Sequence, residues 1–363
     1  MKNVISNNAD FLFLYDAFQC NPNGDPDQEN KPRMDYDTDT NLVTDTRVKR
    51  YVRDYLRHVK NEDIFVDMEG NSKVSPDTRL KNVITTLIND EARLDAVLPE
   101  DLKKIFNDLK NKTKDKTAEQ IIKLMQGEKE KADKKDDKAK DDAAKDDKKD
   151  DKSKAEIMRL NYFLLAHLVK DKFIDVRMFG SAFAIKGFTK AYTGPIQMNW
   201  GYSLHKVKIM DSSSIVTIMN DDNSTFGKDY RVHYSLLAFN GTINCNAAKS
   251  TELTTDDINT FRESLWESIS NNGGMPSRSK LNQYPKLYVE IKYKTGISNG
   301  YFGDLRQYVT VTPKVEADKI RGLQDLNLDF SRLYDLLKTH KDVIENLGIY
   351  VKNAIGFDFK INN

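Results

Sequence analysis

The hydrophobic and polar positions of this chain fall into short apolar runs and longer amphipathic stretches, a pattern that predicts a mixed α and β fold. Near the start, Phe11–Phe18 reads FLFLYDAF, a short aromatic run typical of a buried central strand. Thr44–Val59 has apolar residues on one face of a helix, and residues 76–126 and 155–170 also have helical spacing. The first half is therefore expected to be one strand followed mainly by helices.

Strand patterns dominate the second half of the chain. We expect strands at Asp175–Phe179, Pro195–Tyr202, Ser214–Met219, Tyr230–Asn244, Lys286–Tyr293 and Gln307–Val311. Helices are expected at Thr254–Ser270, where Thr254 begins a good N-cap signal, and at Asp329–Asn346. This order of elements is compatible with an α+β domain of the RRM-like or ferredoxin-like type.

Two polar segments interrupt these patterns. Residues 20–41 are rich in Asn, Pro, Gly and Asp and predict a long loop, which in a compact domain is usually functional or disordered. Residues 127–154 contain 11 Lys and 11 Asp or Glu, so the run is neutral and has no hydrophobic face to bury. We expect this run to be a disordered, solvated insertion.

Composition narrows the function classes only slightly. The net charge of +1 gives no overall excess of cations for nucleic acid, so any such binding depends on local patches. Cys20 and Cys245 lack metal-ligand spacing and are expected to be reduced thiols. The first residues contain only four consecutive apolar positions, too few for a signal peptide or a membrane span. We expect a cytoplasmic protein with no membrane partner.

One helix collects positive charge on a single face. Between Val43 and Lys60 the polar face carries six cations against the one acid Asp54. These cations are Arg47, Lys49, Arg50, Arg53, Arg57 and Lys60. An ordinary amphipathic helix and a membrane-surface helix both remain possible on this pattern. The third interpretation is phosphate binding, in which Lys and Arg one turn apart follow a nucleic-acid backbone without reading its bases.

The loop and this helix also carry a recognisable motif. In the segment CNPNGDPDQENKPRMDYDTDTNLVTDTRVKRYVRDYL, N-P-N-G-D-P is followed by L-V-T-D-x-x-x-K-R-x-x-R. The pairing resembles the backbone subunit of type I CRISPR Cascade complexes, in the I-B and I-C branch of the Cas-seven family and the RAMP superfamily. Further matches follow in order: DVRMFG at 175–180, TGPIQMNWGYSLHKV at 193–207 and TFGKDYRVHYSLLAFNGTINC at 225–245.

The resemblance implies an architecture and a role. It implies an RRM-like palm (1–60, 171–206 and 235–363), a helical fingers insertion (61–170) and a β-hairpin thumb (207–234). It implies a subunit without catalytic residues or a cofactor that binds the CRISPR guide RNA (crRNA). It also implies that copies of the subunit form a helical filament on the guide, together with other Cascade subunits, and present it to the target DNA strand. A subunit that serves any guide must hold the backbone and leave the base edges free.

Site residues follow from the same motifs. The resemblance implies that the loop residues Asn21, Asn23, Gly24 and Asp25 line the guide-RNA groove. It also implies phosphate contacts from Lys49, Arg50 and Arg53, which Arg47 and Arg57 extend along the same helix face. At the thumb, Met219 and Phe226 are candidates for an apolar wedge, with Lys228 as a basic neighbour. The sequence departs from the family pattern at Gly227-Lys228-Asp229, so the individual thumb contacts stay open.

Two other functions remain open. Sister subunits of type III complexes cleave RNA with an aspartate in a comparable loop, so Asp25 or Asp27 would be the candidate in a metal-dependent ribonuclease. Alternatively, the Lys/Asp run at 127–154 would recruit protein partners to a scaffold. A metal site is not expected, because the five histidines are scattered and Asp35, Asp37 and Asp39 lack the Gly and Glu of an EF-hand loop.

Overall fold

The computed structural model describes residues 3–66, 76–113, 117–126, 143–185, 188–210, 214–218 and 224–359. The chain divides into two units, each with its own contacts. Unit 1 combines Met1–Glu62 with Gly194–Asn363, and unit 2 is Asp63–Thr193. Unit 2 is therefore an insertion between two segments of unit 1.

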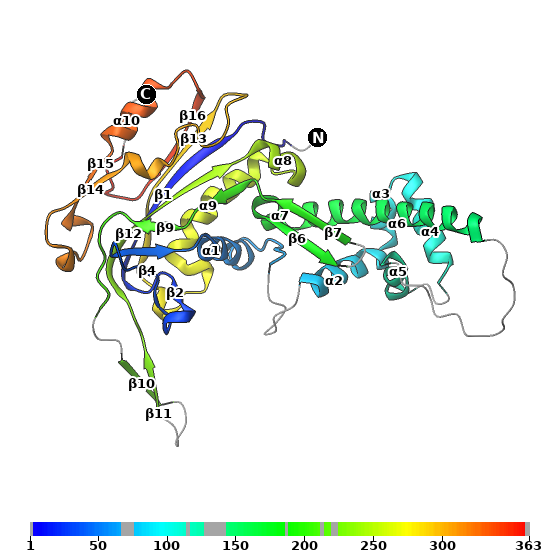
Figure 1. Cartoon of the computed structure of the whole chain (residues 1–363), viewed down its shortest axis with the longest axis horizontal. Helices are drawn as coiled ribbons and strands as arrows, with labels where there is room; N and C mark the ends of the chain where they lie inside the picture. The colour runs from blue at the N-terminus through cyan, green and yellow to red at the C-terminus, as the bar shows by residue number, and fades with distance from the viewer. Residues whose placement is uncertain are drawn as a thin grey trace. The chain divides into compact units, whose positions relative to one another are not determined.

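An eight-stranded antiparallel sheet forms the centre of unit 1 (Figure 1). Its strands, in sheet order, are β16 (Ile344–Asn353), β13 (Gln283–Tyr293), β1 (Ala9–Cys20), β12 (Val232–Ile243), β9 (Gly201–Ser203), β5 (Thr40–Val43) and β4 (Met34–Asp35). The eighth strand, β8 (Ile196–Met198), also pairs with β12. The sequence order β1, β9, β12, β13 becomes β13, β1, β12, β9 in the sheet, so the strand order is not sequential.

The central position of β1 follows from its apolar run, as predicted. Phe11 and Tyr15 point to one face, where Phe11 packs edge-on against Phe261 of α9 (Thr255–Asn271). Leu12 and Leu14 point to the other face and share a core with α10 (Ser331–Thr339). Both faces of the strand are buried, which explains why the run does not alternate between apolar and polar residues.

Two helices begin at threonine caps, of which Thr254 was predicted from the sequence. In α1 (Asp45–His58), the Thr44 hydroxyl accepts a hydrogen bond from the N–H of Arg47 at 3.2 Å. In α9, the Thr254 hydroxyl accepts from the N–H of Asp257, whose carboxylate accepts from the N–H of Thr254, forming a capping box. The apolar face of α1 is buried, and the Tyr51 hydroxyl accepts a hydrogen bond from Gln283 on β13.

Unit 2 is mainly helical, as the spacing over 76–126 and 155–170 predicted. Its elements are α2 (Pro76–Asn89), α3 (Glu91–Val97), α4 (Glu100–Asn111), α5 (Ala118–Met125), α6 (Ala143–Lys172), α7 (Ile174–Phe179) and the hairpin β6 (Gly180–Ile185) and β7 (Phe188–Thr193). The apolar faces of α2, α4, α5 and α6 form one core with Phe173 and Tyr192. Residues 171–193, expected in the palm, belong to unit 2 because Phe173, Val176 and Tyr192 lie in this core.

The prediction of disorder across 127–154 is wrong for its C-terminal part. Residues 143–154 belong to α6, whereas residues 127–142 lie outside the described residues. Leu160 and Leu164 anchor the same helix in the core of unit 2. Once a helix is nucleated, Ala and Lys extend it at little cost in free energy. The apolar face in the C-terminal part of α6 therefore allows the helix to continue through residues 143–154, which have no apolar face of their own.

One further prediction of secondary structure is wrong, and another is right only in its first part. Asp175–Phe179 was expected as a strand but belongs to the short helix α7 (Ile174–Phe179). The buried Asp175 carboxylate accepts hydrogen bonds from the N–H groups of Phe65 and Val66, which fixes this turn. The helix expected over Asp329–Asn346 ends at Thr339, and Ile344 begins β16, because pairing with β13 provides backbone hydrogen bonds there. A short apolar run in a sequence is typical of a strand and of a buried helix alike, so the pattern alone does not distinguish the two.

The remaining elements of unit 1 connect the sheet strands. β10 (Ser214–Ile218) and β11 (Ser224–Lys228) form an antiparallel hairpin between β9 and β12, in which Phe226 stands opposite Val216. Met219 lies outside the described residues. The other short elements of unit 1 are β2 (Gly24–Asp25), β3 (Lys31–Pro32), α8 (Cys245–Thr251), β14 (Thr310–Pro313) and β15 (Leu326–Asp329). The strand expected over Gln307–Val311 overlaps β14 only at its end, since Leu305–Tyr308 is a 3-10 turn.

Candidate nucleic-acid interface

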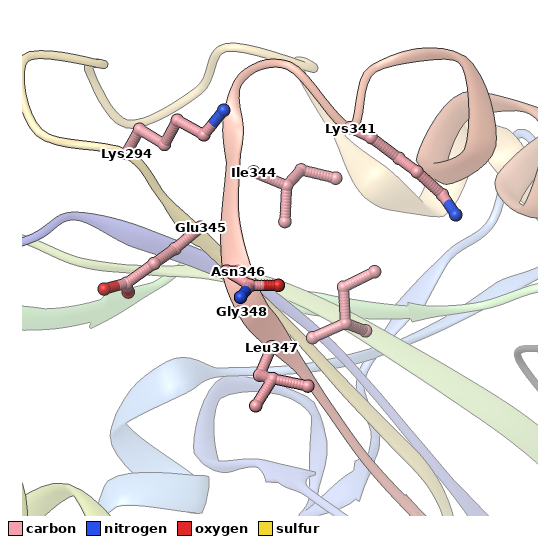
Figure 2. A pocket seen from close by; sticks show the side chains of 8 residues that line it. Lys294, Lys341, Ile344, Glu345, Asn346, Leu347 and Gly348 are labelled. Carbon is pink, nitrogen blue, oxygen red and sulfur yellow. The ribbon is translucent and has the colours of Figure 1, made fainter. Parts of the chain in front are cut away.

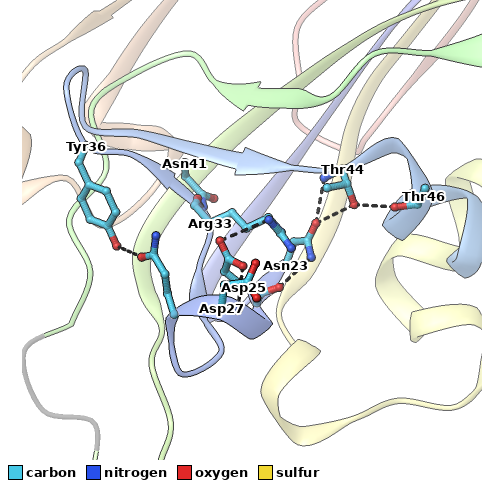
Figure 3. Close-up of polar contacts among 10 residues, drawn as sticks. Asn23, Asp25, Asp27, Arg33, Tyr36, Asn41, Thr44 and Thr46 are labelled. Atoms are coloured by element: carbon cyan, nitrogen blue, oxygen red, sulfur yellow. Dashed lines mark hydrogen bonds and ion pairs between the residues drawn. The ribbon is translucent and has the colours of Figure 1, made fainter.

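The loop that follows β1 is fastened to the first turn of α1 by Asn23. The Asn23 side-chain oxygen accepts hydrogen bonds from the N–H and the hydroxyl of Thr44, both at 2.9 Å (Figure 3). The Asn23 amide also donates to the carbonyl oxygen of Gly24 at 3.3 Å. The polar groups of Asn23 are therefore used inside the protein, where they position the loop beside the helix.

Asn21 and Gly24 determine the shape of the same loop. Asn21 is buried, and its amide donates to the carbonyl oxygen of Asn30 at 2.7 Å. A Cβ atom on Gly24 would lie 1.9 Å from the Asn30 side-chain oxygen and 3.0 Å from its carbonyl oxygen. Position 24 therefore requires glycine for space. Sequence analysis chose both residues as groove-lining, and the structure uses them to close the loop onto itself.

Asp25 also takes part in contacts within the loop. Its carboxylate lies 3.3 Å from the Arg33 guanidinium and accepts a hydrogen bond from the N–H of Asp27 at 3.2 Å (Figure 3). Arg33 in turn lies over the Trp200 ring, 5.8 Å from its centroid. No group of three or more His, Cys, Asp or Glu side chains suited to a metal ion occurs in the described part of the chain.

The basic face of α1 is less open than the helical wheel indicated. Lys49 was placed on the exposed face, but it is buried, with its ammonium 2.9 Å from the Asp45 carboxylate and 3.0 Å from the Gln197 side-chain oxygen. Arg50 is half-buried and pairs with Asp54 at 2.5 Å. A wheel gives the angle of each side chain and cannot show that Gln197, from β8, lies beside Lys49. Arg53 and Arg57 are half-buried and also make contacts within the protein.

Arg47 differs from Lys49 and Arg50 on the same helix face, because its guanidinium contacts an aromatic ring and not a carboxylate. Its guanidinium lies over the Tyr51 ring, 4.1 Å from the centroid. Its Nε is buried without a hydrogen-bond partner, although buried donors are nearly always paired. No carboxylate lies within ion-pair distance of Arg47 in the described residues. An oriented guanidinium with a spare donor is suited to an anion.

Lys280, a residue that sequence analysis missed, is linked to Tyr51 through Gln283, whose amide donates to the Lys280 carbonyl oxygen and to the Tyr51 hydroxyl. It ends a short 3-10 turn before β13, and its ammonium donates to the carbonyl oxygen of Asn21 at 2.6 Å. Burial lowers the pKa of Lys280 to about 8, and the positive charge of Arg47 is the next largest cause. Lys280 is distant in sequence, and only the pairing of β13 with β1 brings it to the loop.

More cations lie near the loop, from the segments before β12 and β13. Arg231 and Arg278 share a single acid, Asp229, at 2.7 and 3.3 Å. Arg231 also donates to the carbonyl oxygen of Gln19 at 2.9 Å. Because two guanidinium groups share one carboxylate, this part of the surface keeps an excess of positive charge.

Lys228, at the base of the β10–β11 hairpin, is engaged with the loop. Its ammonium donates to the Glu29 carboxylate at 2.9 Å, and the Tyr230 hydroxyl donates to the same oxygen at 2.9 Å. These hydrogen bonds lower the pKa of Glu29 and raise that of Lys228. The pair is exposed, so it guides the position of the hairpin base more than it stabilises the fold.

A separate pocket lies at the β16 edge of the sheet (Figure 2). It has a volume of about 530 Å³ and is lined by residues 344–349 together with Lys294 and Lys341. The Lys294 ammonium donates to the carbonyl oxygen of Asp342. None of the residues chosen from the sequence lies in this pocket. Within the described residues, no helix has both the length and the apolarity needed to cross a bilayer.

Comparison with known proteins identifies the family. The sequence profile described as CRISPR-associated protein Cas7 matches residues 7–331. The CRISPR-associated protein Cas7 of Haloferax volcanii is 27% identical over 375 residues, covering 97% of this chain and 89% of the relative. A solved chain titled "CRISPR RNA-guided surveillance complex, pre-nicking" is 13% identical with a TM-score of 0.41, covering 80% of both chains.

A second solved chain, titled "CRISPR RNA-guided surveillance complex", has the same identity and TM-score over 95% of this chain and 90% of its own length. A TM-score of 0.41 is too low to support a conclusion, so the assignment rests on the sequence matches alone. The profile match extends from Asn7, just before β1, to Ser331, the first residue of α10, and includes the Asn21–Asp25 loop and all of α1. The chain belongs to the Cas7 family of CRISPR-associated proteins.

Proposed function

We propose that this protein is the crRNA-binding backbone subunit of a type I Cascade complex. In this role, copies of the chain form a helical filament along one guide, beside other Cascade subunits, and present the guide to the target DNA strand. Membership of the Cas7 family supports the proposal. A cytoplasmic location in a prokaryotic cell is part of it.

The architecture is consistent with a palm, fingers and thumb. In unit 1, the chain order β1-α1-β9-β12-α9-β13 and the sheet order β13-β1-β12-β9 match an RRM-like or ferredoxin-like arrangement, which supports a palm. The helical insertion Asp63–Thr193 would form the fingers, and the β10–β11 hairpin with Phe226 and Lys228 would form the thumb.

The observation that carries the proposal is the group of cations around the Asn21–Asp25 loop. Arg33, Arg47, Arg231, Arg278 and Lys280 come from separate segments and lie near one loop. Arg50, Arg53 and Arg57 would extend phosphate contacts along α1. Such side chains hold a ribose-phosphate backbone without reading its bases, as a subunit that serves any guide requires.

The contacts of Asp25 favour a structural subunit over a ribonuclease. A carboxylate that binds a catalytic metal needs further oxygen or nitrogen ligands nearby. Asp25 instead pairs with Arg33 and caps the turn at Asp27. Incubating the purified protein with single-stranded RNA and Mg²⁺ tests this assignment, because cleavage that disappears in Asp25→Ala would support the enzyme.

A salt series tests RNA binding directly. Gel shifts with several unstructured single-stranded RNAs of unrelated sequence should give similar affinities. The affinities should fall together as salt rises, because phosphate contacts release counterions. An affinity independent of salt, or a strong preference for one sequence, would contradict the proposal. Co-purification with a small RNA of discrete length would support it independently.

A further inference from the structure

A bulge interrupts β16, the strand at one edge of the sheet in unit 1. Residues 345–348 of β16 stand opposite the single residue Lys292 of β13, because the register shifts there. Leu347 lies in this bulge with a φ of 58° and is 91% exposed. A left-handed backbone is unfavourable for leucine, and a side chain this exposed adds nothing to the core. The bulge therefore holds an apolar side chain in solvent.

Two lysines beside the bulge lack a carboxylate partner. Lys294 and Lys341 line the pocket of about 530 Å³ together with Leu347, and we call these three residues the Leu347 pocket (Figure 2). The Glu345 carboxylate is already paired with Lys292 at 2.7 Å. In the described part of the chain, neither Lys294 nor Lys341 forms an ion pair, although Lys294 donates to a backbone carbonyl oxygen. The pocket thus combines two positive charges with an exposed apolar side chain.

The opposite edge of the same sheet carries complementary groups. Residues 36–39 form the turn between β4 and β5, and all of their side chains are exposed. We call Tyr36, Asp37 and Asp39 in this turn the acidic turn. Tyr36 is 56% exposed between the carboxylates of its neighbours. An aromatic ring flanked by carboxylates is the chemical counterpart of a leucine flanked by lysines.

Hydrogen bonds within the chain hold the acidic turn in shape without neutralising it. The Asp35 carboxylate accepts from the N–H of Asp37 at 3.1 Å, and the Tyr36 hydroxyl donates to the Gln28 side-chain oxygen at 2.8 Å (Figure 3). Asp39 lies 3.4 Å from the ammonium of Lys206, whereas Asp37 has no ion pair among the described residues. The turn is therefore preorganised and keeps an excess of negative charge.

We propose that the acidic turn of one copy of this chain docks into the Leu347 pocket of the next copy. The inference rests on the proposed function, because it names two surfaces through which neighbouring copies on one RNA meet. Tyr36 packs on Leu347, and the two aspartates face the two lysines. β16 is the first strand in the sheet order and β4 is the last, so the contact joins two different surfaces. Such a heterologous contact repeats from copy to copy, as a helical filament requires.

The size of the two surfaces sets the strength of the contact. One turn in one pocket buries much less than the roughly 1,200 Å² of a stable interface, so free copies should associate only weakly. A bound RNA holds neighbouring copies side by side and raises their effective concentration. The contact should therefore act as cooperativity of RNA binding and not as a stable dimer of the free chain.

Charge reversal in the full chain tests the contact. The pocket variant combines Lys294→Glu with Lys341→Glu, and the turn variant combines Asp37→Lys with Asp39→Lys. All of these side chains are exposed, so the fold should tolerate the changes. Each variant alone brings like charges together at every contact. An equal mixture of the two variants instead pairs each reversed surface with its opposite, and it should restore what either variant alone has lost.

The readout is the affinity for a long unstructured single-stranded RNA divided by the affinity for a short one that accommodates a single copy. This ratio reports contacts between copies, because changes in general RNA affinity cancel. Each variant alone should lower the ratio by about tenfold, and the mixture should return it to the wild-type value. The control variant, Lys249→Glu with Lys314→Glu, has the same change in charge at exposed lysines that donate to neutral oxygens. Its ratio should match that of the wild type.

Leu347→Asn tests the apolar part of the contact separately. Asparagine tolerates a left-handed backbone better than leucine does, so the urea midpoint of unfolding should not fall. The ratio of affinities should nevertheless decrease, because Tyr36 of the neighbouring copy loses its apolar partner. A lower urea midpoint with an unchanged ratio would mean that Leu347 serves only the fold of its own chain.

The remaining outcomes separate this inference from the proposed function. If the wild type binds both RNAs without cooperativity, or if the mixture does not restore the ratio, the contact is wrong while RNA binding stands. A loss confined to the pocket variant would show that a partner other than the acidic turn occupies the pocket, which also overturns the inference. If the wild type binds neither RNA, the proposed function fails and the inference fails with it.

Discussion

The side-chain oxygen of Asn23 accepts two hydrogen bonds from Thr44, one from its N–H and one from its hydroxyl, both at 2.9 Å (Figure 3). The Thr44 hydroxyl oxygen in turn accepts from the N–H of Arg47 at 3.2 Å. A continuous series of hydrogen bonds thus joins the loop, the cap of α1 and the backbone of Arg47. The N-P-N-G and L-V-T-D motifs form one structural unit.

Replacing Asn23 should test this connection. Asn23→Ala removes the acceptor for both Thr44 donors and should lower the free energy of unfolding by about 1–3 kcal/mol. Asn23→Asp keeps an acceptor in place and should lose less. Urea denaturation measures both variants, and Asn327→Ala, at an exposed position of β15, serves as the control. Equal losses in the Ala and Asp variants would show that the acceptor is not the important group.

Lys49 should contribute to stability more than to RNA binding. Its ammonium is held by Asp45 and Gln197, so Lys49→Gln should lower the free energy of unfolding by about 1 kcal/mol. The same change should alter RNA affinity at pH 7 by less than about twofold, whereas Arg47→Gln should reduce it by about tenfold. Gel shifts and urea denaturation on both variants check this difference. A larger loss of RNA affinity in Lys49→Gln would show that Lys49 does contact phosphate.

The buried His205 should make stability depend on pH. Its Nε2 accepts a hydrogen bond from the N–H of Leu236 at 3.1 Å, and its other nitrogen contacts the Lys206 carbonyl oxygen at 2.8 Å. Burial lowers the pKa of His205 below 6.5, so the folded protein disfavours the charged form. The unfolded chain therefore binds more protons, and this stabilisation is fully present above pH 6.5 and lost as pH falls through the folded pKa.

The difference between wild type and His205→Gln isolates this effect. The free energy of unfolding of the wild type should fall more steeply than that of His205→Gln as pH decreases below about 6.5. His58→Gln is the control, because His58 is exposed at the end of α1. Identical slopes for wild type and His205→Gln would show that the hydrogen bond to Leu236 does not control this titration.

Several elements could be predicted from the sequence because their causes are local. The apolar run at Phe11–Phe18 indicated a buried central strand, the amphipathic pattern over Thr44–Val59 indicated α1, and Thr254 marked the start of α9. The motif at Asn21–Asp25 predicted residues that line a guide-RNA groove, and this stays a prediction. It could not indicate that these side chains bond to Thr44, Asn30 and Arg33, since each partner is brought in by the folded loop.

Sequence by itself determined which segments are apolar, where two principal helices begin, and that cations gather on α1. Tertiary structure alone decided which of those cations are balanced and which others join them: β8 brings Gln197 to Lys49, while β13 brings Lys280 to the Asn21–Asp25 loop. Hydrophobic periodicity and capping act over a few residues and are visible in a linear sequence. Charge balance depends on distance in space, and strand pairing sets that distance between residues far apart in the chain.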